Sequence, residues 1–327
     1  CTLTATNLAQ WAQAELPALG DSFAFCPGNL RQLAAACKYF TGELAVQYAP
    51  AEGAPDGEHP EGRVQFQSGG KFCEQWSTAT DLFPELPTFE PVQICQASLA
   101  SIRSRYERIK YAVCTRADHP ELGGVQFRDD RMIALDGYRL AWARDPALRA
   151  ERPFTVPDWA MRQLSGIPAG QCRILVGERY ASFETGGSRL VTRLLPGSFL
   201  DVDQAVPARF REECRCDVSQ AMESIRYLGD CTGGKKFVVR LDRGILSRDK
   251  GGDGVSAILP LDPPSDMVIG LDARFLLDAL GQFHAQKTAS VTMRMDTGLS
   301  PVVLTDGSGD LALLLPCRLR ESGTSAA

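Results

Sequence analysis

Apolar positions along the chain recur with two different spacings, and three stretches arrange them in the same way. In each stretch an alternating run leads into a run with apolar residues three and four positions apart, and a second alternating run follows. The three stretches are residues 23–48, 154–176 and 267–294. Alternation is typical of a half-buried strand, and spacing of three and four is typical of an amphipathic helix. The pattern therefore predicts a strand–helix–strand unit that occurs three times.

Capping residues support the three helices of this repeat. Each helix is expected to begin at a residue whose side-chain oxygen can accept a hydrogen bond from a first-turn N–H group. These residues are Asn29, Asp158 and Asp272. A second kind of helix recurs at residues 96–113 and 217–228, the latter capped by Asp217. Two half-units, each a helix with several strands, would together form one domain.

Most of the chain between these helices is predicted to be strand. Strands are expected at residues 1–6, 43–48, 124–128, 172–176, 180–184, 188–195, 236–241, 290–294 and 310–315. The glycine pairs 186–187 and 233–234 are expected to form hairpin turns. Residues 49–62 are rich in Pro, Gly and Glu and predict a long hairpin loop, whereas residues 320–327 predict a polar tail. The fold class is therefore α+β.

The length of 327 residues exceeds what one hydrophobic core usually supports. The repeat predicts domains at residues 1–91, 92–207 and 208–319, followed by the tail. The first of them shows only the later of its two half-units. We therefore expect that the N-terminal part of this first domain is missing from the chain.

Charge and composition exclude several classes of protein. A net charge of −5 argues against a protein that coats nucleic acid with its whole surface, but it permits a local basic strip. No apolar run approaches the length of a membrane span. Eleven scattered cysteines, without a Cys-x-x-Cys pair, indicate reduced thiols in a cytoplasmic protein.

No catalytic or metal-binding pattern is evident. The three histidines, His59, His119 and His284, lack ligand spacing to a cysteine or to one another. Neither a Gly-x-Ser-x-Gly motif nor a phosphate-binding Gly-rich loop with Lys-Ser/Thr occurs. We therefore expect no enzyme activity, no metal and no cofactor.

A hairpin signal at Asp136-Gly137 carries a resemblance to a known family. Residues 134–141 read Ala-Leu-Asp-Gly-Tyr-Arg-Leu-Ala. They closely resemble the Ala-Thr-Asp-Gly-His-Arg-Leu-Ala signature of bacterial sliding clamps, the beta subunit of DNA polymerase III. Residues 118–125, 194–207 and 315–319 are similar to further clamp segments in the same order. The resemblance covers nearly the whole chain, with low identity between these segments, so it indicates a divergent member.

The resemblance implies a fold, a function and a set of partners. The fold would be three sliding-clamp domains in a crescent, the first of them truncated, and the crescent would form half of a ring. Two copies would close head-to-tail around duplex DNA, with helices lining the hole and strands outside. Tyr227, Leu228 and the strand from Lys236 are the expected third-domain contacts between copies. The ring would tether the replicative polymerase without catalysing a reaction. DNA polymerase and clamp-loader subunits would dock through short peptide motifs.

Basic residues on the predicted helices are candidates for contact with DNA. Lys and Arg neutralise phosphates without reading sequence, which suits a ring that must slide. The candidates are Arg31, Lys38, Arg103, Arg105, Arg108, Lys110, Arg162 and Arg226. The alternative reading of each of these residues is a solvated helix face.

The resemblance also implies a peptide pocket between the second and third domains. Its lining would be Leu122, Gly137, Tyr138, Arg139, Leu140, Leu313, Leu315, Pro316, Cys317 and Arg318, with Phe199, Leu200 and Ala205 on the rim. Leu140 and Leu315 are expected to form its wall, and Arg139 and Pro316 its floor. The alternative for the leucines is core packing.

This chain departs from the family pattern at several positions, among them Val202, where the family has a Tyr. Leu135 and Tyr138 replace a Thr and a His of the signature, and Leu200 and Gln204 replace a Pro and an Arg of the rim segment. These changes leave open an accessory clamp-like protein that serves another polymerase or acts only as a peptide-binding scaffold. An unrelated β-rich enzyme is the third possibility, and the lack of an acid, base or metal cluster argues against it.

Overall fold

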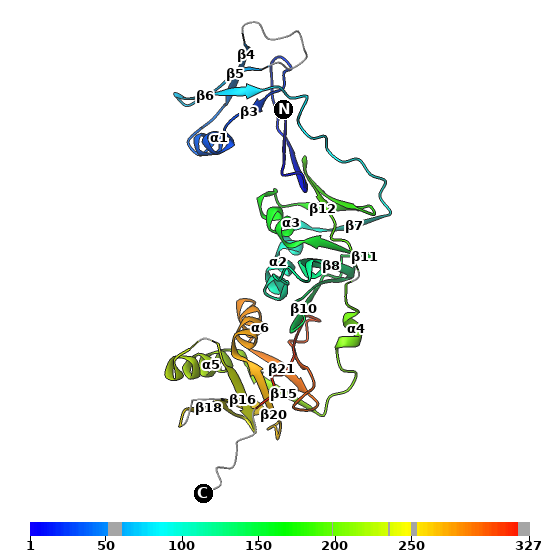
Figure 1. Cartoon of the computed structure of the whole chain (residues 1–327), viewed down its shortest axis with the longest axis vertical. Helices are drawn as coiled ribbons and strands as arrows, with labels where there is room; N and C mark the ends of the chain where they lie inside the picture. Colours follow the sequence, from blue (N-terminus) through cyan, green and yellow to red (C-terminus); the bar gives the residue numbers. More distant parts are fainter. Residues whose placement is uncertain (52–60, 198, 235, 250–253, 320–327) are drawn as a thin grey trace. The chain divides into compact units, whose positions relative to one another are not determined.

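The computed structural model describes residues 1–51, 61–197, 199–234, 236–249 and 254–319 (Figure 1). These residues separate into two compact units. The first unit holds residues 1–8 and 15–87, and the second holds residues 9–14 and the chain from Thr88 onward. The predicted tail, most of the predicted 49–62 loop and His59 lie outside the described residues. The boundaries of the three predicted domains stay a prediction.

The first unit contains a four-stranded antiparallel sheet and one helix. The strand order is β3 (Cys26–Pro27), β6 (Lys71–Thr78), β5 (Gly62–Ser68) and β4 (Ala45–Pro50), and β1 (Thr2–Thr6) precedes them in the chain. Helix α1 (Leu30–Cys37) is capped by Asn29, whose Oδ1 accepts a hydrogen bond from the Gln32 N–H at 3.0 Å, so this predicted cap is confirmed. Val64, Phe66 and Cys73 form the small core.

The second unit is built on one nine-stranded antiparallel sheet. Its order is β11 (Ala150–Pro157), β8 (Gly124–Asp129), β9 (Arg131–Leu135), β10 (Arg139–Arg144), β23 (Leu311–Leu314), β22 (Val302–Thr305), β21 (Ser290–Met295), β15 (Glu212–Asp217) and β19 (Leu261–Asp262). The pair β10–β23 joins segments far apart in the chain, with Leu140 opposite Leu313. The two halves of this unit therefore share one continuous sheet.

Two smaller sheets complete the strands of the second unit. One contains, in order, β2 (Gln10–Glu15), β14 (Ser188–Arg193), β13 (Tyr180–Thr185), β12 (Gln171–Val176) and β7 (Gln93–Ser98). The other contains β18 (Ser256–Ile258), β17 (Ile245–Arg248), β16 (Val238–Asp242) and β20 (Val268–Asp272). The predicted turn at Gly186-Gly187 is confirmed, because both residues have positive φ and connect β13 to β14.

The helices of the second unit pack in a row. They are α2 (Leu99–Ile109), α3 (Asp158–Gln163), α5 (Val218–Thr232) and α6 (Ala273–Ala285). The short turns are η1 (Lys110–Ala112), η2 (Pro120–Leu122) and η3 (Leu164–Gly166), and the four-residue α4 (Val202–Ala205) lies apart from the row (Figure 1). Helix α2 contacts η3 on one side and α6 on the other, and α6 packs on α5 (Figure 1). Each half has its own apolar core, and Tyr111 packs against both cores.

Sequence-based expectations for the helix ends were partly wrong. Asp217 and Asp272 cap α5 and α6 as predicted. Helix α2 begins at Leu99 rather than Gln96, because residues 96–98 complete β7, where Cys95 and Ala97 alternate into the core. Asp158 is the first helical residue of α3 rather than its cap, and its carboxylate accepts a hydrogen bond from the Tyr106 hydroxyl at 2.6 Å.

Two further expectations need correction in the second half. Gly233 is not part of a hairpin turn: it ends α5 with a φ of +72°, and the Gly234 N–H donates to the Gly229 carbonyl at 3.1 Å. A left-handed glycine satisfies the last carbonyls of a helix in this way. Leu228 is buried among the residues of the second core, so its side chain cannot form a surface contact, whereas Tyr227 is exposed.

Candidate functional site

The turn between β9 and β10 is formed by Asp136 and its neighbours. The Asp136 N–H donates to the Arg139 carbonyl at 3.1 Å, and Asp136 Oδ1 accepts from the Tyr138 and Arg139 N–H groups at 3.0 Å each. Gly137 has a φ of +87°, a conformation that glycine adopts without steric cost. The predicted Asp-Gly hairpin is therefore confirmed, and its geometry depends on a carboxylate that accepts two backbone hydrogen bonds.

Arg139 directs its guanidinium into the protein. Its Nε lies 2.9 Å from Asp136 Oδ2, and its Nη1 lies 2.6 Å from Asp278 Oδ2 on α6. The guanidinium carbon lies 4.4 Å from the centre of the Phe275 ring and 5.3 Å from that of Tyr111, and the side chain is only 13% exposed. Burial raises the pKa of Tyr111, so this phenol stays neutral. Arg139 therefore fastens the turn to the second half of the unit.

Several predicted pocket residues meet in a third apolar cluster, which we call the central cluster. Its buried members are Cys114, Leu122, Ile133, Leu135, Leu140, Val202, Val303, Leu311 and Leu313. Phe199 packs against the central cluster from the segment before α4. Leu140 and Leu313 are each only 3% exposed, so they form a packed base and offer almost no surface. Of the two leucines expected to form the wall of the pocket, only Leu315 is exposed.

The exposed part of the candidate site lies where the chain leaves β23. Leu315 is 42% exposed, and its N–H donates to the Tyr138 carbonyl at 2.9 Å. Tyr138 is 52% exposed, and the centre of its ring lies 6.3 Å from that of Phe275 and 5.2 Å from the guanidinium carbon of Arg116. Two exposed residues with large side chains therefore lie opposite each other, at the end of the strand pair that carries the buried Leu140 and Leu313.

The remaining predicted pocket residues are spread around this edge. The Cys317 N–H donates to the Gly270 carbonyl at 2.8 Å, which holds the chain after β23 against β20. Pro316 and Cys317 are half-buried, and Gly137 and Arg318 are exposed. On the rim, Ala205 ends α4 and is half-buried, and Leu200 is 56% exposed. The assignment of all thirteen residues to a peptide site stays a prediction.

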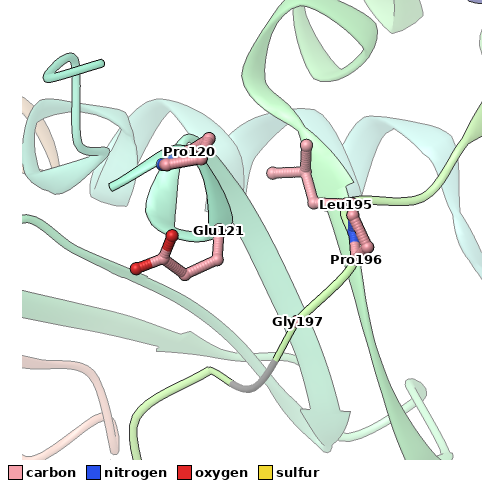
Figure 2. A pocket seen from close by; sticks show the side chains of 5 residues that line it. All are labelled: Pro120, Glu121, Leu195, Pro196 and Gly197. Atoms are coloured by element: carbon pink, nitrogen blue, oxygen red, sulfur yellow. The ribbon is translucent and has the colours of Figure 1, made fainter. Parts of the chain in front are cut away.

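A shallow hollow adjoins the site at η2, the turn that carries Leu122. It has a volume of about 340 Å³ and is lined by Pro120, Glu121, Leu195, Pro196 and Gly197. Figure 2 shows Pro120 and Leu195 on opposite sides of the hollow, with the Glu121 carboxylate pointing away from Leu195. Hydrogen bonds from its own backbone N–H and from His119 lower the pKa of Glu121. Sequence reasoning missed these residues, although both segments belong to the stretches that resemble clamps.

The candidate DNA-facing residues of α2 already have partners within the chain. Arg103 donates to the Leu164 and Ile167 carbonyls, and Arg105 Nε donates to the Arg144 carbonyl at 2.8 Å. Arg108 Nη1 lies 2.7 Å from the buried carboxylate of Asp310. These three guanidiniums therefore stabilise the packing of α2, and whether they also contact DNA stays a prediction.

The other candidates are more exposed. Lys110 pairs with Glu107 at 2.6 Å on the surface of the helix row. Arg162 on α3 pairs with Asp158 and has a side chain that is 68% exposed. Arg226 on α5 is exposed, and in the first unit Arg31 and Lys38 are exposed on and directly after α1. Arg162 and Arg226 therefore offer cations on α3 and α5, and Lys110 offers one on η1, directly after α2.

The described part of the chain shows neither a metal-binding cluster nor a membrane-spanning helix. No group of three or more His, Cys, Asp or Glu residues is arranged there to hold a metal ion. None of the described helices is long and apolar enough to cross a membrane. All eleven cysteines lie among the described residues, and each is a free thiol.

Comparisons with known proteins point to one family, although no model of a protein family matches the chain. The beta sliding clamp of Synechocystis sp. is 23% identical over 301 residues, which cover 81% of this chain and 76% of that clamp.

The solved structures that the chain resembles are also sliding clamps. The DNA polymerase III beta subunit of Thermotoga maritima matches 98% of this chain and 88% of its own, with a TM-score of 0.80 at 20% identity. A Bartonella birtlesii sliding clamp, bound to griselimycin, matches 97% and 88%, with a TM-score of 0.80 at 18% identity. The predicted likeness to bacterial sliding clamps and the α+β clamp fold are thereby confirmed. The chain is therefore similar in sequence to bacterial beta sliding clamps over most of its length, and it has their fold.

Proposed function

We propose that this protein is a sliding clamp that encircles duplex DNA and tethers a DNA polymerase, without catalysing a reaction. The observation that carries the proposal is the match of nearly the whole chain to the fold of DNA polymerase III beta subunits. A ring needs a second copy of the chain, so the working form is a homodimer. Its partners are duplex DNA, the polymerase and clamp-loader subunits.

Contact with DNA would come from the row of helices. Lys110, Arg162 and Arg226 are exposed cations on η1, α3 and α5, and Arg31 and Lys38 add two more in the first unit. Cations of this kind neutralise phosphates and carry no sequence preference, so the protein can slide. Arg103 and Arg108 would support the helix row through their internal partners.

Retention on circular DNA tests this contact. The protein is loaded on a nicked circle, and the rate of escape is measured after the circle is linearised, because a ring leaves only over an end. Changing Lys110, Arg162 and Arg226 to Glu should reduce retention. It should also make the plot of log binding constant against log salt concentration less steep, by about one unit of slope per lost phosphate contact. The matched control changes three exposed cations outside the helices, Arg193, Arg211 and Arg243, to Glu in the same way.

Two outcomes would contradict the ring. One is an escape rate that does not change when the circle is linearised. The other is light scattering of the full-length protein at micromolar concentration that gives the mass of one copy rather than of two. An equal effect of the helix and control variants would place the DNA contact elsewhere.

Polymerase and loader subunits would dock as short peptides on the edge formed by Leu315 and Tyr138. The exposed apolar side chains above a packed base suit a small extended peptide with apolar anchors. Such a contact is small, so we expect a micromolar dissociation constant, which corresponds to a binding free energy of about −8 kcal/mol. The Bartonella clamp bound to griselimycin supports the view that a protein of this fold accepts a ligand.

A labelled peptide with a Gln and a Leu-Phe end tests the docking edge. Leu315→Asp should abolish binding, because a carboxylate buried under the peptide would have no partner. Leu299→Asp is the matched control, since Leu299 is also an exposed leucine of the second unit. Equal binding by wild type and Leu315→Asp would show that peptides do not use this edge.

An accessory clamp-like scaffold is the second candidate function. It is favoured by the rim, where Leu200 is exposed and Gln204 donates to Asp201 Oδ2 at 3.0 Å, because the family has a Pro and an Arg at these positions. Peptide binding without retention on circular DNA would support this alternative.

A further inference from the structure

The segment that connects the two halves of the second unit is fastened to the first half. Its helix α4 has only four residues, too few to be stable alone. Val202, the first of them, is fully buried in the central cluster. Asp201 and Asp203 flank Val202 and face the β8–β9 hairpin, where their partners lie.

Two arginines of that hairpin share the carboxylate of Asp203. Arg131 Nη1 lies 2.7 Å from Asp203 Oδ1 and its Nη2 lies 3.4 Å from Oδ2, so the guanidinium grips the carboxylate with both arms. Arg128 Nη2 lies 3.0 Å from Asp203 Oδ2, and its Nη1 lies 3.3 Å from Asp201 Oδ1. Arg131 beside it lowers the pKa of Asp203, which keeps the carboxylate charged.

Arg131 is itself held in place by an aromatic ring. Its guanidinium carbon lies 5.0 Å from the centre of the Trp142 indole, and the Trp142 Nε1–H donates to the Gly309 carbonyl at 2.9 Å. Isolated surface ion pairs contribute little to stability, but forked and networked pairs on an ordered arginine contribute more. The network therefore fixes α4 at one place on the hairpin.

We propose that Asp203 is a positioning residue for the peptide site, because its pairs with Arg128 and Arg131 hold α4 and thereby the rim. Phe199 packs against the central cluster three residues before Val202, and Ala205 ends α4, so both follow the position of this short helix. Leu200 lies between Phe199 and the helix and is solvent-facing. The inference rests on the proposed function, because it concerns the rim of the proposed site.

Hydrogen exchange and peptide titration together test the positioning role. Asp203→Ala should speed amide exchange in residues 199–206 by about ten-fold and leave β8 and β9 protected. It should weaken peptide binding by about five-fold, through faster dissociation. Asp203→Glu keeps the charge and should bring both the exchange rate and the peptide affinity most of the way back to the wild-type values. Asp230→Ala, at an exposed aspartate of α5, is the control and should change neither.

Each result decides between the positioning role and its alternatives. Unchanged exchange in Asp203→Ala would overturn the role of the ion pairs. Faster exchange with unchanged peptide affinity would overturn the link between α4 and the site. A wild-type protein that binds no peptide would refute the peptide site and with it the positioning role, while exchange would still show whether Asp203 holds α4. If Asp203→Ala does not fold, Arg128→Gln removes two of the contacts and serves the same comparison.

Discussion

Arg139 and Asp278 form an ion pair with an Nη1–Oδ2 distance of 2.6 Å, although 139 residues separate them in the chain. The pair joins the Asp136-Gly137 turn to α6, in the other half of the second unit. It explains the arginine that follows the turn, for which an ordinary hairpin has no need. Asp136 shapes the turn, and Arg139 anchors it next to Tyr138 and Leu315.

Removal of this anchor should destabilise the second unit. Arg139→Ala leaves the half-buried carboxylates of Asp136 and Asp278 without their partner and takes a cation from the Phe275 ring. We expect a loss of about 2 kcal/mol in the free energy of unfolding, measured with urea. Lys110→Ala, which breaks a surface pair, should cost less than about 0.5 kcal/mol. Equal losses in the two variants would contradict an anchoring role.

Charge reversal at Arg108 should affect folding rather than DNA contact alone. Asp310 is buried and accepts hydrogen bonds from Arg108 Nη1 at 2.7 Å and from the Arg144 N–H at 2.9 Å. Arg108→Glu would place a second carboxylate against it and should cost about 3 kcal/mol or more. In thermal denaturation the midpoint temperature should drop strongly for Arg108→Glu and hardly at all for Arg226→Glu, because Arg226 is exposed. A similar drop in both would contradict the assignment.

Stability should fall at alkaline pH because of Cys216. Burial, with Asp217 and Cys214 nearby, raises the pKa of this thiol from its usual 9.0 to about 12. A group whose pKa is raised in the folded state contributes stability that is complete below pH 9 and is lost between about pH 9 and 12. The stability difference between wild type and Cys216→Ala should therefore shrink from pH 8 to pH 11 in urea unfolding. For the exposed Cys231→Ala the difference should stay constant, and a parallel decline there would refute the prediction.

Gly124 should tolerate no side chain. It lies on β8, opposite Pro157 of β11, and a Cβ built there would overlap the Val156 carbonyl. Gly124→Ala should therefore cost about 3 kcal/mol, because the overlap is with backbone that cannot move aside. Gly166→Ala is the control, because a Cβ built at Gly166 would meet no described atom within 4 Å beyond its chain neighbours. The free energy of unfolding of this variant should stay within about 0.5 kcal/mol of the wild-type value. Equal stability of the two variants would contradict the close approach.

Local features of this protein were determined by the sequence alone. The caps at Asn29, Asp217 and Asp272 and the turn at Asp136-Gly137 depend on residues at most three positions away. The start of α2 was predicted wrongly, because the partner of β7, strand β12, lies more than seventy residues further along the chain and decides where β7 ends. The clamp fold itself was predictable from four short segments in the right order, and the structural matches confirm it.

Only the tertiary structure decided which charges and leucines are available to a partner. Arg103 donates to carbonyls more than sixty residues away, and Arg108 pairs with an aspartate 202 residues away. Leu140 and Leu313 became a packed base because β10 and β23 pair, whereas Leu315 just beyond them stayed exposed. The sequence names the cations and apolar residues of a clamp. Their use depends on contacts between distant segments, which no local pattern encodes, and burial and pairing are properties of the folded chain.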